Sequence, residues 1–359
     1  MIFYHFKMTL QNQFMPVNAK KRDQKIRLIN NAIDELSNSS SDCQLCPRMC
    51  HINRNKGEIG FCGVGNCALI AHYCLHFGEE PCLSGYYDYN EKLQTGSSLS
   101  GSGTVFFAGC NLKCIYCQNY QISWQVFGSE VSTDKLASIF LFLQEKKALN
   151  INLVTPTHVV LPILKALKKA FALGLNIPIV YNTSAYDSYE TIAHLDGIID
   201  IYLPDFKYYN KDSAQRFSNA PDYPDKAIRA IKEMYRQVGN LEIDTEGTAK
   251  NGLIIRHLIL PGQMEESCTI LEWIAANIST QVHISLMSQF HPCNSVPDEI
   301  NRQISNNEYQ GVLDKAEELG FENVYIQTHP STFKEHLLPD FRKENPFSWE
   351  EKESDVVIN

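Results

Sequence analysis

The chain has 359 residues, of which 44% are hydrophobic and 20% are charged. This composition excludes disordered and collagen-like chains, and the length allows two or three domains or one barrel with attached segments. The net charge of −9 argues against a nucleic-acid-binding role, which needs a basic face, and no apolar run is long enough to cross a membrane.

The twelve cysteines are the most informative part of the composition. Seven lie within residues 43–82 and three within residues 110–117. The N-terminal sequence shows no secretory signal, so we expect a cytoplasmic protein whose thiols stay reduced. Crowded reduced thiols usually bind metal or carry out redox chemistry.

The first predicted element is an amphipathic helix over residues 22–36, followed by the polar linker SNSSSD at 37–42. Residues 43–95 are rich in Cys, Gly and Tyr and show no lasting periodicity, so we expect metal ligation to stabilise them. The predicted parts of the chain are a helical N-terminal extension and linker (1–42), a Cys-rich metal-binding segment (43–95), a barrel (96–331) and a polar, surface-wrapping or mobile tail (332–359).

From residue 96 onward, strand and helix signals alternate. Short apolar segments predict strands at 104–109, 151–155, 177–182, 198–204, 253–260, 282–287 and 323–327. Their continuous apolar character is typical of a parallel sheet that is buried on both faces. The repeated strand–helix units indicate an α/β fold, either a (β/α) barrel or an open doubly wound sheet. We favour a full or partial barrel, because the strand series continues without a clear reversal point.

Residues 110–117, CNLKCIYC, directly follow the first of these strands, where active-site loops of such folds lie. Three thiolates at this spacing can hold an iron–sulfur cluster. A [4Fe–4S] cluster takes four ligands, so three thiolates leave one iron with an open position. Two alternatives are a zinc site completed by a distant Cys or His and a thioredoxin-like role for Cys114 and Cys117, which leaves the third thiol unexplained.

A second thiolate set precedes the barrel. It consists of Cys43, Cys46, Cys50 and Cys62. Four thiolates close a tetrahedral zinc site or hold a second cluster equally well. Further candidate ligands are Cys67, Cys74 and Cys82. The remaining alternative is that these are small buried side chains without a metal.

The Cys-x₃-Cys-x₂-Cys pattern, with Tyr116 before its last cysteine, resembles the signature of radical S-adenosylmethionine (SAM) enzymes. Over most of residues 43–330, further segments resemble relatives of pyruvate formate-lyase activating enzyme; these are CQLCPRMC, NINLVTPTH, VYNTSAY, DIYLPDFKYY, IRHLILPG and a stretch ending in QFHP. The resemblance implies a partial (β/α)₆ TIM-like barrel. It also implies a catalytic [4Fe–4S] cluster bound by Cys110, Cys114 and Cys117.

The implied chemistry is the reductive cleavage of SAM to methionine and a 5′-deoxyadenosyl radical, which abstracts hydrogen from a substrate. The implied partners are SAM, a low-potential electron donor and an unidentified protein or small-molecule substrate. Activation of a glycyl radical enzyme, an oxidoreductase function, is the named activity of the resembled relatives. The alternative from another class is a non-catalytic zinc or iron–sulfur protein, structural or electron-transferring, on a barrel scaffold.

The resemblance also implies a set of SAM contacts. The backbone around Tyr116 lies near adenine, and Asn182, at the end of the third strand, faces the ribose. Asp205 and Lys207 lie near the methionyl carboxylate, where the lysine can neutralise charge. A pairing of these two with each other is the plainer explanation. His291 in QFHP resembles a SAM-contacting histidine, or is an ordinary loop residue.

One implied contact is altered in this chain. The resembled family has a Gly-Gly-Glu-Pro-type segment after the second strand, where this sequence has VTPTH at 154–158. Thr155 can offer a hydroxyl or backbone group and His158 an imidazole, unless this segment only begins the next helix. Farther on, Arg256 and His257 interrupt an apolar strand; neighbours in a strand face opposite ways, so at most one enters the barrel. The sequence does not decide which.

Overall fold

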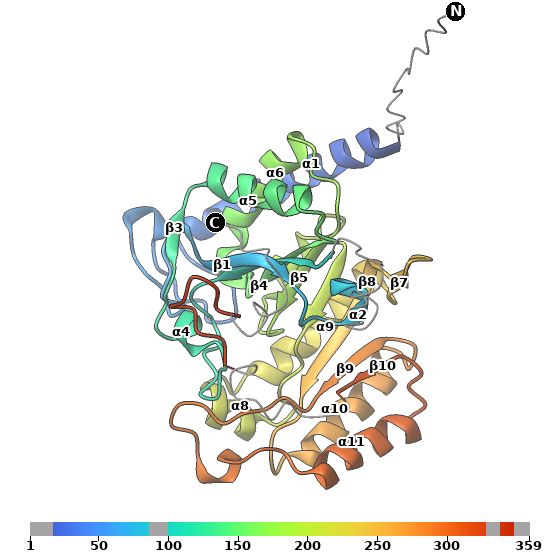
Figure 1. Cartoon of the computed structure of the whole chain (residues 1–359). Helices are drawn as coiled ribbons and strands as arrows, with labels where there is room; N and C mark the ends of the chain where they lie inside the picture. Colours follow the sequence, from blue (N-terminus) through green and yellow to red (C-terminus); the bar gives the residue numbers. More distant parts are fainter. Residues whose placement is uncertain (1–16, 86–99, 328–337, 348–359) are drawn as a thin grey trace, which may run out of the picture.

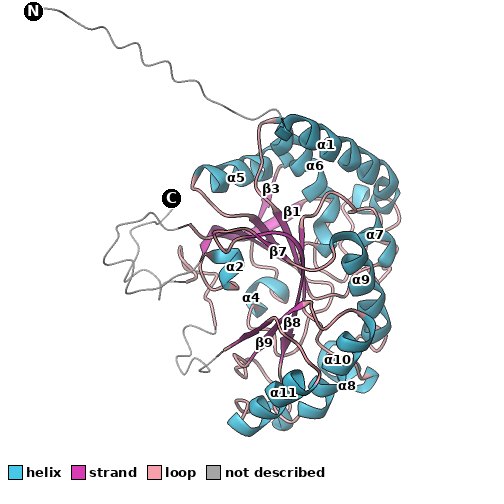
Figure 2. Ribbon diagram, turned by 90° about the vertical axis from the view of Figure 1, so that its right-hand side faces the viewer, coloured by secondary structure: helices cyan, strands magenta, loops and turns pink. Residues whose placement is uncertain are grey.

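The computed structural model describes residues 17–85, 100–327 and 338–347. Its centre is a curved ten-stranded sheet in the order β10-β9-β8-β6-β5-β4-β2-β1-β3, with β7 paired to β8. The long helices cover the convex face of this sheet, and the concave face is turned away from them (Figures 1 and 2). This is an α/β fold of the partial-barrel type.

Neighbouring strands from β2 to β10 run parallel. They are β2 (Ser102–Phe107), β4 (Ile151–Val154), β5 (Ile179–Thr183), β6 (Ile201–Pro204), β8 (Ala249–Leu258), β9 (His283–Met287) and β10 (Val324–Ile326). Each coincides with a predicted strand, so those seven predictions are confirmed. Their continuous apolar character has the expected cause, because helices bury one face and the barrel interior buries most of the other.

Three of the helices between the strands begin at side-chain caps. The helices between the strands are α5 (Thr133–Glu145), α6 (Val160–Ala172), α7 (Tyr189–Ala193), α8 (Lys211–Ser218), α9 (Tyr223–Val238), α10 (Met264–Asn277) and α11 (Asn306–Glu318). The Ser132 side chain caps α5, that of Asn210 caps α8, and Ser305 with Glu308 forms a capping box at α11. The sequence reading missed α8.

The N-terminal helix α1 (Val17–Leu36) packs beside α6 on the convex side (Figure 1). Lys25 on this helix is buried, and its Nζ lies 2.6 Å from Asp200 Oδ2 and 2.9 Å from the Ile198 carbonyl oxygen. This buried ion pair attaches α1 to the segment that enters β6. No helix in the described ranges is long and apolar enough to span a membrane.

The Cys-rich segment contributes a strand to the main sheet, which the sequence reading did not anticipate. Strand β1 (Ala68–His76) pairs antiparallel with β2 and with β3 (Ser129–Val131). Its burial is uneven, and its sequence mixes His, Tyr and Cys with aliphatic residues, so no strand pattern stands out. Three short elements were missed as well: α2 (Pro81–Ser84), α4 (Tyr120–Ser123) and β7 (Glu242–Ile243).

Of the polar C-terminal tail expected over residues 332–359, the structure describes residues 338–347, and these include two buried aromatic rings. Phe341 and Phe347 are only 2% and 5% exposed, and they pack with Phe106 of β2. The backbone N–H of Phe341 donates to Gln121 Oε1 on α4 at 2.7 Å. Two aromatic rings among charged neighbours therefore fix residues 338–347 against the sheet, beside β1 and α4 (Figure 1).

Candidate active site

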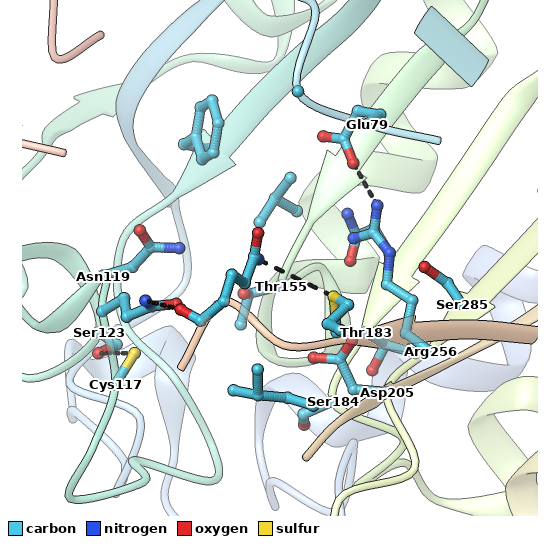
Figure 3. Close-up of a pocket in the computed structure, with 18 of the residues that line it drawn as sticks. Glu79, Cys117, Asn119, Ser123, Thr155, Thr183, Ser184, Asp205, Arg256 and Ser285 are labelled. Carbon is cyan, nitrogen blue, oxygen red and sulfur yellow. Dashed lines mark hydrogen bonds and ion pairs between the residues drawn. The ribbon is translucent and has the colours of Figure 1, made fainter. Parts of the chain in front are cut away.

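A cavity of about 530 Å³ lies on the concave side, at the carboxyl ends of the parallel strands (Figure 3). Every parallel strand from β2 to β10, or the residue that follows it, lines this cavity, and His76 of β1 and Phe347 of the C-terminal segment lie at its wall. This end of a barrel is where ligands bind, because the loops that follow the strands converge there.

The loop of residues 109–117 leaves β2 through a glycine that the fold requires. Gly109 has a φ of +85°, and a Cβ there would lie 2.5 Å from Val64 Cγ2 and 2.6 Å from the Cys62 carbonyl oxygen. Only glycine accepts this backbone at such close approach. The loop is thereby held directly against the Cys-rich segment.

The three thiols of this loop all line the cavity. Cys110 Sγ accepts the backbone N–H groups of Leu112 and Lys113 at 3.4 and 3.5 Å. Cys117 Sγ accepts the Ser123 hydroxyl at 3.2 Å, a bond drawn in Figure 3. Donors aimed at sulfur suit anionic thiolates.

Burial raises the pKa of Cys110, and it raises that of Cys117 to about 12, with the Cys114 thiolate acting in the same direction. The polypeptide alone therefore keeps these two thiols protonated at neutral pH. A metal centre changes this, since thiols ligate metal only as thiolates.

Tyr116 also lines the cavity, but its ring is fixed in the core. Its hydroxyl accepts that of Tyr208 at 2.8 Å, and the ring packs edge-on against Phe217 and Phe290. Its carbonyl accepts the Cys293 thiol at 3.4 Å. The structure therefore immobilises the residue between the last two thiols of the loop.

Asp205 and Lys207 follow β6 and face the cavity together, with Nζ 2.7 Å from Oδ2. Burial lowers the pKa of Lys207, but the Asp205 carboxylate and then the Cys114 thiolate outweigh it and raise the pKa above its usual value. The lysine is therefore a permanent cation beside the three-cysteine loop.

The choice between Arg256 and His257 is settled by their hydrogen bonds. His257 faces the helix layer, with Nδ1 2.7 Å from the Phe206 carbonyl oxygen and Nε2 2.8 Å from Ser267 Oγ on α10. Burial lowers its pKa to about 4, so it is neutral. Arg256 points the other way and lines the cavity.

Sequence reasoning missed the partners of Arg256. Its Nη2 lies 2.5 Å from Glu79 Oε2 and 2.6 Å from Glu80 Oε2, and His76 Nδ1 lies 3.2 Å from Glu79 Oε1. Burial opposes ionisation of Glu79, but Arg256 and then His76 lower its pKa to about 2. The signal available in the sequence was two adjacent acids in GEEP, within a segment otherwise poor in charge. In Figure 3, Glu79 and Arg256 lie across the cavity from Cys117.

Of the other residues that the sequence suggests as SAM contacts, some line the cavity and some do not. Thr155 and Asn182 line the cavity, and the backbone N–H of Thr155 donates to the Asn182 carbonyl oxygen at 2.9 Å. His158 instead lies in the core, with Nε2 2.9 Å from the Ala108 carbonyl oxygen, so it supports the base of the cysteine loop. His291 is not part of the cavity lining.

A buried carboxylate holds the altered segment after β4 in place. Asp187 accepts the hydroxyl of Thr157 at 2.7 Å, that of Thr183 at 2.6 Å and that of Tyr181 at 3.1 Å. Burial raises its pKa, and the three hydroxyl donors act against that rise. The ends of β4 and β5 are thus joined behind the cavity without the glycines of the family motif.

Two comparisons bear on the family. The model of the radical SAM superfamily matches residues 104–274. The uncharacterized protein MJ0674 of Methanocaldococcus jannaschii is 30% identical over 315 residues, which cover 84% of this chain and 82% of that protein. The chain belongs to the radical SAM superfamily. Members of this family use a [4Fe–4S] cluster and SAM.

Two solved structures are similar to parts of this chain, both with TM-scores below 0.5. A radical SAM methyltransferase from Sphaerobacter thermophilus has a TM-score of 0.47 and 12% identity, over 63% of this chain and 66% of that chain, slightly under two thirds. The native enzyme anSMEcpe, solved with bound AdoMet and a peptide, has a TM-score of 0.43 and 12% identity, over 61% and 60%. Neither likeness bears on the reaction of this radical SAM chain.

The three-cysteine loop fits the family's cluster. Its donor set is three thiols on one loop, with hydrogen-bond donors at two sulfurs and the charge of Lys207 nearby. Among the described residues, no three His, Cys, Asp or Glu side chains already have metal-binding geometry, and this holds for both cysteine sets alike. None of the twelve cysteines forms a disulfide bond in the structure.

Of the seven cysteines before the barrel, Cys67 is exposed, and Cys74 lies on β1. Cys82, on α2, packs under the cavity with residues of β5, β6 and β8. These three are separated from one another. The other four come together in the loops before β1, behind the active-site loop.

Proposed function

We propose that this radical SAM enzyme binds its [4Fe–4S] cluster through Cys110, Cys114 and Cys117 and binds SAM in the adjoining cavity. The observation that carries the proposal is that all three thiols line the same cavity as Asn182 and Lys207. A non-catalytic zinc or electron-transfer protein has no need of such a shared cavity.

Such a cluster, held by the three thiols, would supply the electron that splits SAM into methionine and a 5′-deoxyadenosyl radical. The chain contributes binding and exclusion of water. Lys207, held by Asp205, offers a fixed cation to the methionyl carboxylate, and Asn182 offers an amide to the ribose hydroxyls. The Tyr116 backbone and Thr155 complete the SAM contacts. His291 is outside the cavity lining, so we assign it no contact.

The narrower proposal is activation of a glycyl radical enzyme by hydrogen abstraction from a backbone glycine. The segments of residues 43–330 that resemble the activating enzymes support it. The VTPTH segment and the Cys-rich segment set this chain apart from those enzymes, so an unidentified peptide or small molecule is the competing substrate class. We further propose a cytoplasmic location, because twelve cysteines without a disulfide bond suit a reducing compartment.

SAM cleavage tests the main proposal. The chain is reconstituted anaerobically with iron and sulfide, its iron is counted, and it is incubated with SAM and dithionite. We expect 5′-deoxyadenosine from the wild type and none from Cys114→Ala. Cys268→Ala is the matched control, since that thiol lies on α10 and outside the cavity lining, and it should cleave SAM normally. A loaded cluster without cleavage in the wild type would contradict the proposal.

Pyruvate formate-lyase serves as the probe for the narrower proposal. Mixed with the loaded chain, SAM and reductant, it should develop the electron paramagnetic resonance (EPR) signal of a glycyl radical. SAM cleavage without that signal excludes activation of this probe and favours the other substrate class.

A further inference from the structure

The four cysteines before β1 converge on one buried place. Gly60 lies between two of the thiols: a Cβ there would be 3.0 Å from Cys50 Sγ and 3.7 Å from Cys62 Sγ. The backbone N–H of Cys43 donates to the Ile52 carbonyl oxygen at 3.0 Å, which folds residues 43–52 back on themselves. Within this fold, the backbone N–H of Met49 donates to the Cys46 carbonyl oxygen at 3.0 Å and that of His51 donates to the Cys43 carbonyl oxygen at 3.1 Å, so buried Cys46 lies in the same compact loop. The set of four anticipated from the spacing is therefore brought together in space.

A buried arginine contacts two of these thiols. Arg54 is 6% exposed, with Nε 3.2 Å from Cys43 Sγ, Nη2 3.6 Å from Cys62 Sγ and Nη1 2.6 Å from the Gly65 carbonyl oxygen. Within the described part of the chain it has no carboxylate partner. A buried cation is costly without neighbouring negative charge. Thiolates held by a metal supply that charge, so Arg54 is an independent indication that this set binds metal.

The same set is connected to the active-site loop. The Cys62 carbonyl oxygen accepts the Cys110 backbone N–H at 3.2 Å. The two sulfur atoms, Cys62 Sγ and Cys110 Sγ, are therefore connected by a path that consists of covalent bonds and this single hydrogen bond. Cys50 is the most exposed of the four thiols, and the side chain of its neighbour Met49 is exposed as well. The set thus extends from the molecular surface to the catalytic loop.

We propose that Cys43, Cys46, Cys50 and Cys62 hold a redox-active iron–sulfur cluster that relays electrons to the active site. A low-potential one-electron protein donor reduces this cluster from the Cys50 side. The cluster then returns to its oxidised state by passing the same electron to the catalytic cluster, and no proton or bond is exchanged. This inference rests on the catalytic cluster proposed above. Zinc does not change oxidation state and cannot take this role.

Iron counting in the full chain tests the site separately from SAM chemistry. After anaerobic reconstitution, we expect about eight iron atoms in the wild type and about four in a Cys110→Ala/Cys114→Ala/Cys117→Ala variant, as one cluster visible by EPR after reduction. That variant cannot cleave SAM, so its remaining cluster is informative even if the proposed function fails. Zinc, or no metal, in this variant would overturn the proposal.

The relay itself is tested with two electron sources. Dithionite reaches the catalytic cluster directly, whereas reduced flavodoxin needs an entry site. In a Cys43→Ala/Cys46→Ala variant, we expect 5′-deoxyadenosine formation to fall at least about tenfold with flavodoxin and less than about twofold with dithionite. The relay would be refuted if the rate of the variant, as a fraction of the wild-type rate, were the same with flavodoxin as with dithionite.

Because the double cysteine variant can lose its fold, Arg54→Gln gives a second measurement. It keeps all four thiols and removes the buried cation beside them. We expect the reduction potential of one cluster to become more negative while that of the other is unchanged, as followed by EPR-monitored titration. The cluster that shifts should be the one that remains in the triple cysteine variant. No shift in either cluster would contradict the assignment.

Discussion

Each of the two cysteine sets has a cation beside it, Arg54 buried and Lys207 partly buried, and the two cations are held differently. Lys207 beside the active-site loop is paired with the carboxylate of Asp205, and both face a cavity. Arg54 in the N-terminal set bonds only to sulfur and a carbonyl oxygen, and none of its four thiols lines the cavity. Three thiols that line a cavity fit the open cluster site that we propose, and four thiols without a cavity fit the proposed closed site. The surroundings, more than the number of cysteines, distinguish them.

Gly109→Ala should disrupt both sites at once. The new Cβ would meet the Cys62 carbonyl oxygen and Val64 at a positive φ, so we expect a loss of unfolding free energy of about 3–5 kcal/mol and of most bound iron. Thermal denaturation and iron counting measure the two effects.

Gly174→Ala is the matched control for that change. It also has a positive φ, of +108°, but nothing lies within 4 Å of its new Cβ, so we expect only about 1 kcal/mol. Equal losses of unfolding free energy in the two variants would show that the contact between the two cysteine sets is not the cause of the destabilisation.

Lys207→Met tests only the proposed site at the three-cysteine loop and leaves the N-terminal set unchanged. It removes the cation that faces the cavity and leaves Asp205 unpaired, so SAM affinity should fall by about 10- to 100-fold. Equilibrium binding of SAM to the loaded enzyme measures this, and the iron content should stay at the wild-type level. An unchanged affinity would remove Lys207 from the SAM site.

Low pH should destabilise the folded protein through protonation of Glu79, which lines the cavity. Its pKa is lowered from 4.5 to about 2 in the folded protein, so its contribution to stability is present above about pH 4.5 and is lost as the pH falls toward 2. Glu79→Gln should therefore be less stable than wild type at pH 6, and the difference should shrink by pH 3. Urea denaturation at the two pH values measures it, and a constant difference would contradict the ion-pair explanation.

The smallest effect is expected at Cys67, which is exposed and separate from both sets. Cys67→Ala should keep the full iron content and change the unfolding free energy by no more than about 0.5 kcal/mol. A loss of iron in this variant would place Cys67 in the N-terminal site and break the four-thiol assignment.

The parallel strands were predictable from sequence because each is a continuous apolar run that carries its own signal. The three-cysteine loop was predictable because its residues are neighbours in the chain. The Glu79–Glu80–Arg256 group was not, since Arg256 lies 176 residues from Glu80 and neither segment indicates the other. The same limit applied to Phe347, whose burial depends on Phe106 across most of the chain. A local sequence pattern predicts secondary-structure elements and motifs whose residues are neighbours in the chain. Contacts between residues so far apart in sequence become visible only in the three-dimensional structure.

The position of Phe347 has a consequence for synthesis of the protein. The cavity wall includes His76, from before the barrel, and Phe347, from beyond the last strand. During translation, the cysteine loop emerges more than 200 residues ahead of Phe347. Until that ring is in place, one part of the cavity wall is missing from the nascent chain. The cavity with its full wall therefore forms only after the end of the chain has been synthesised.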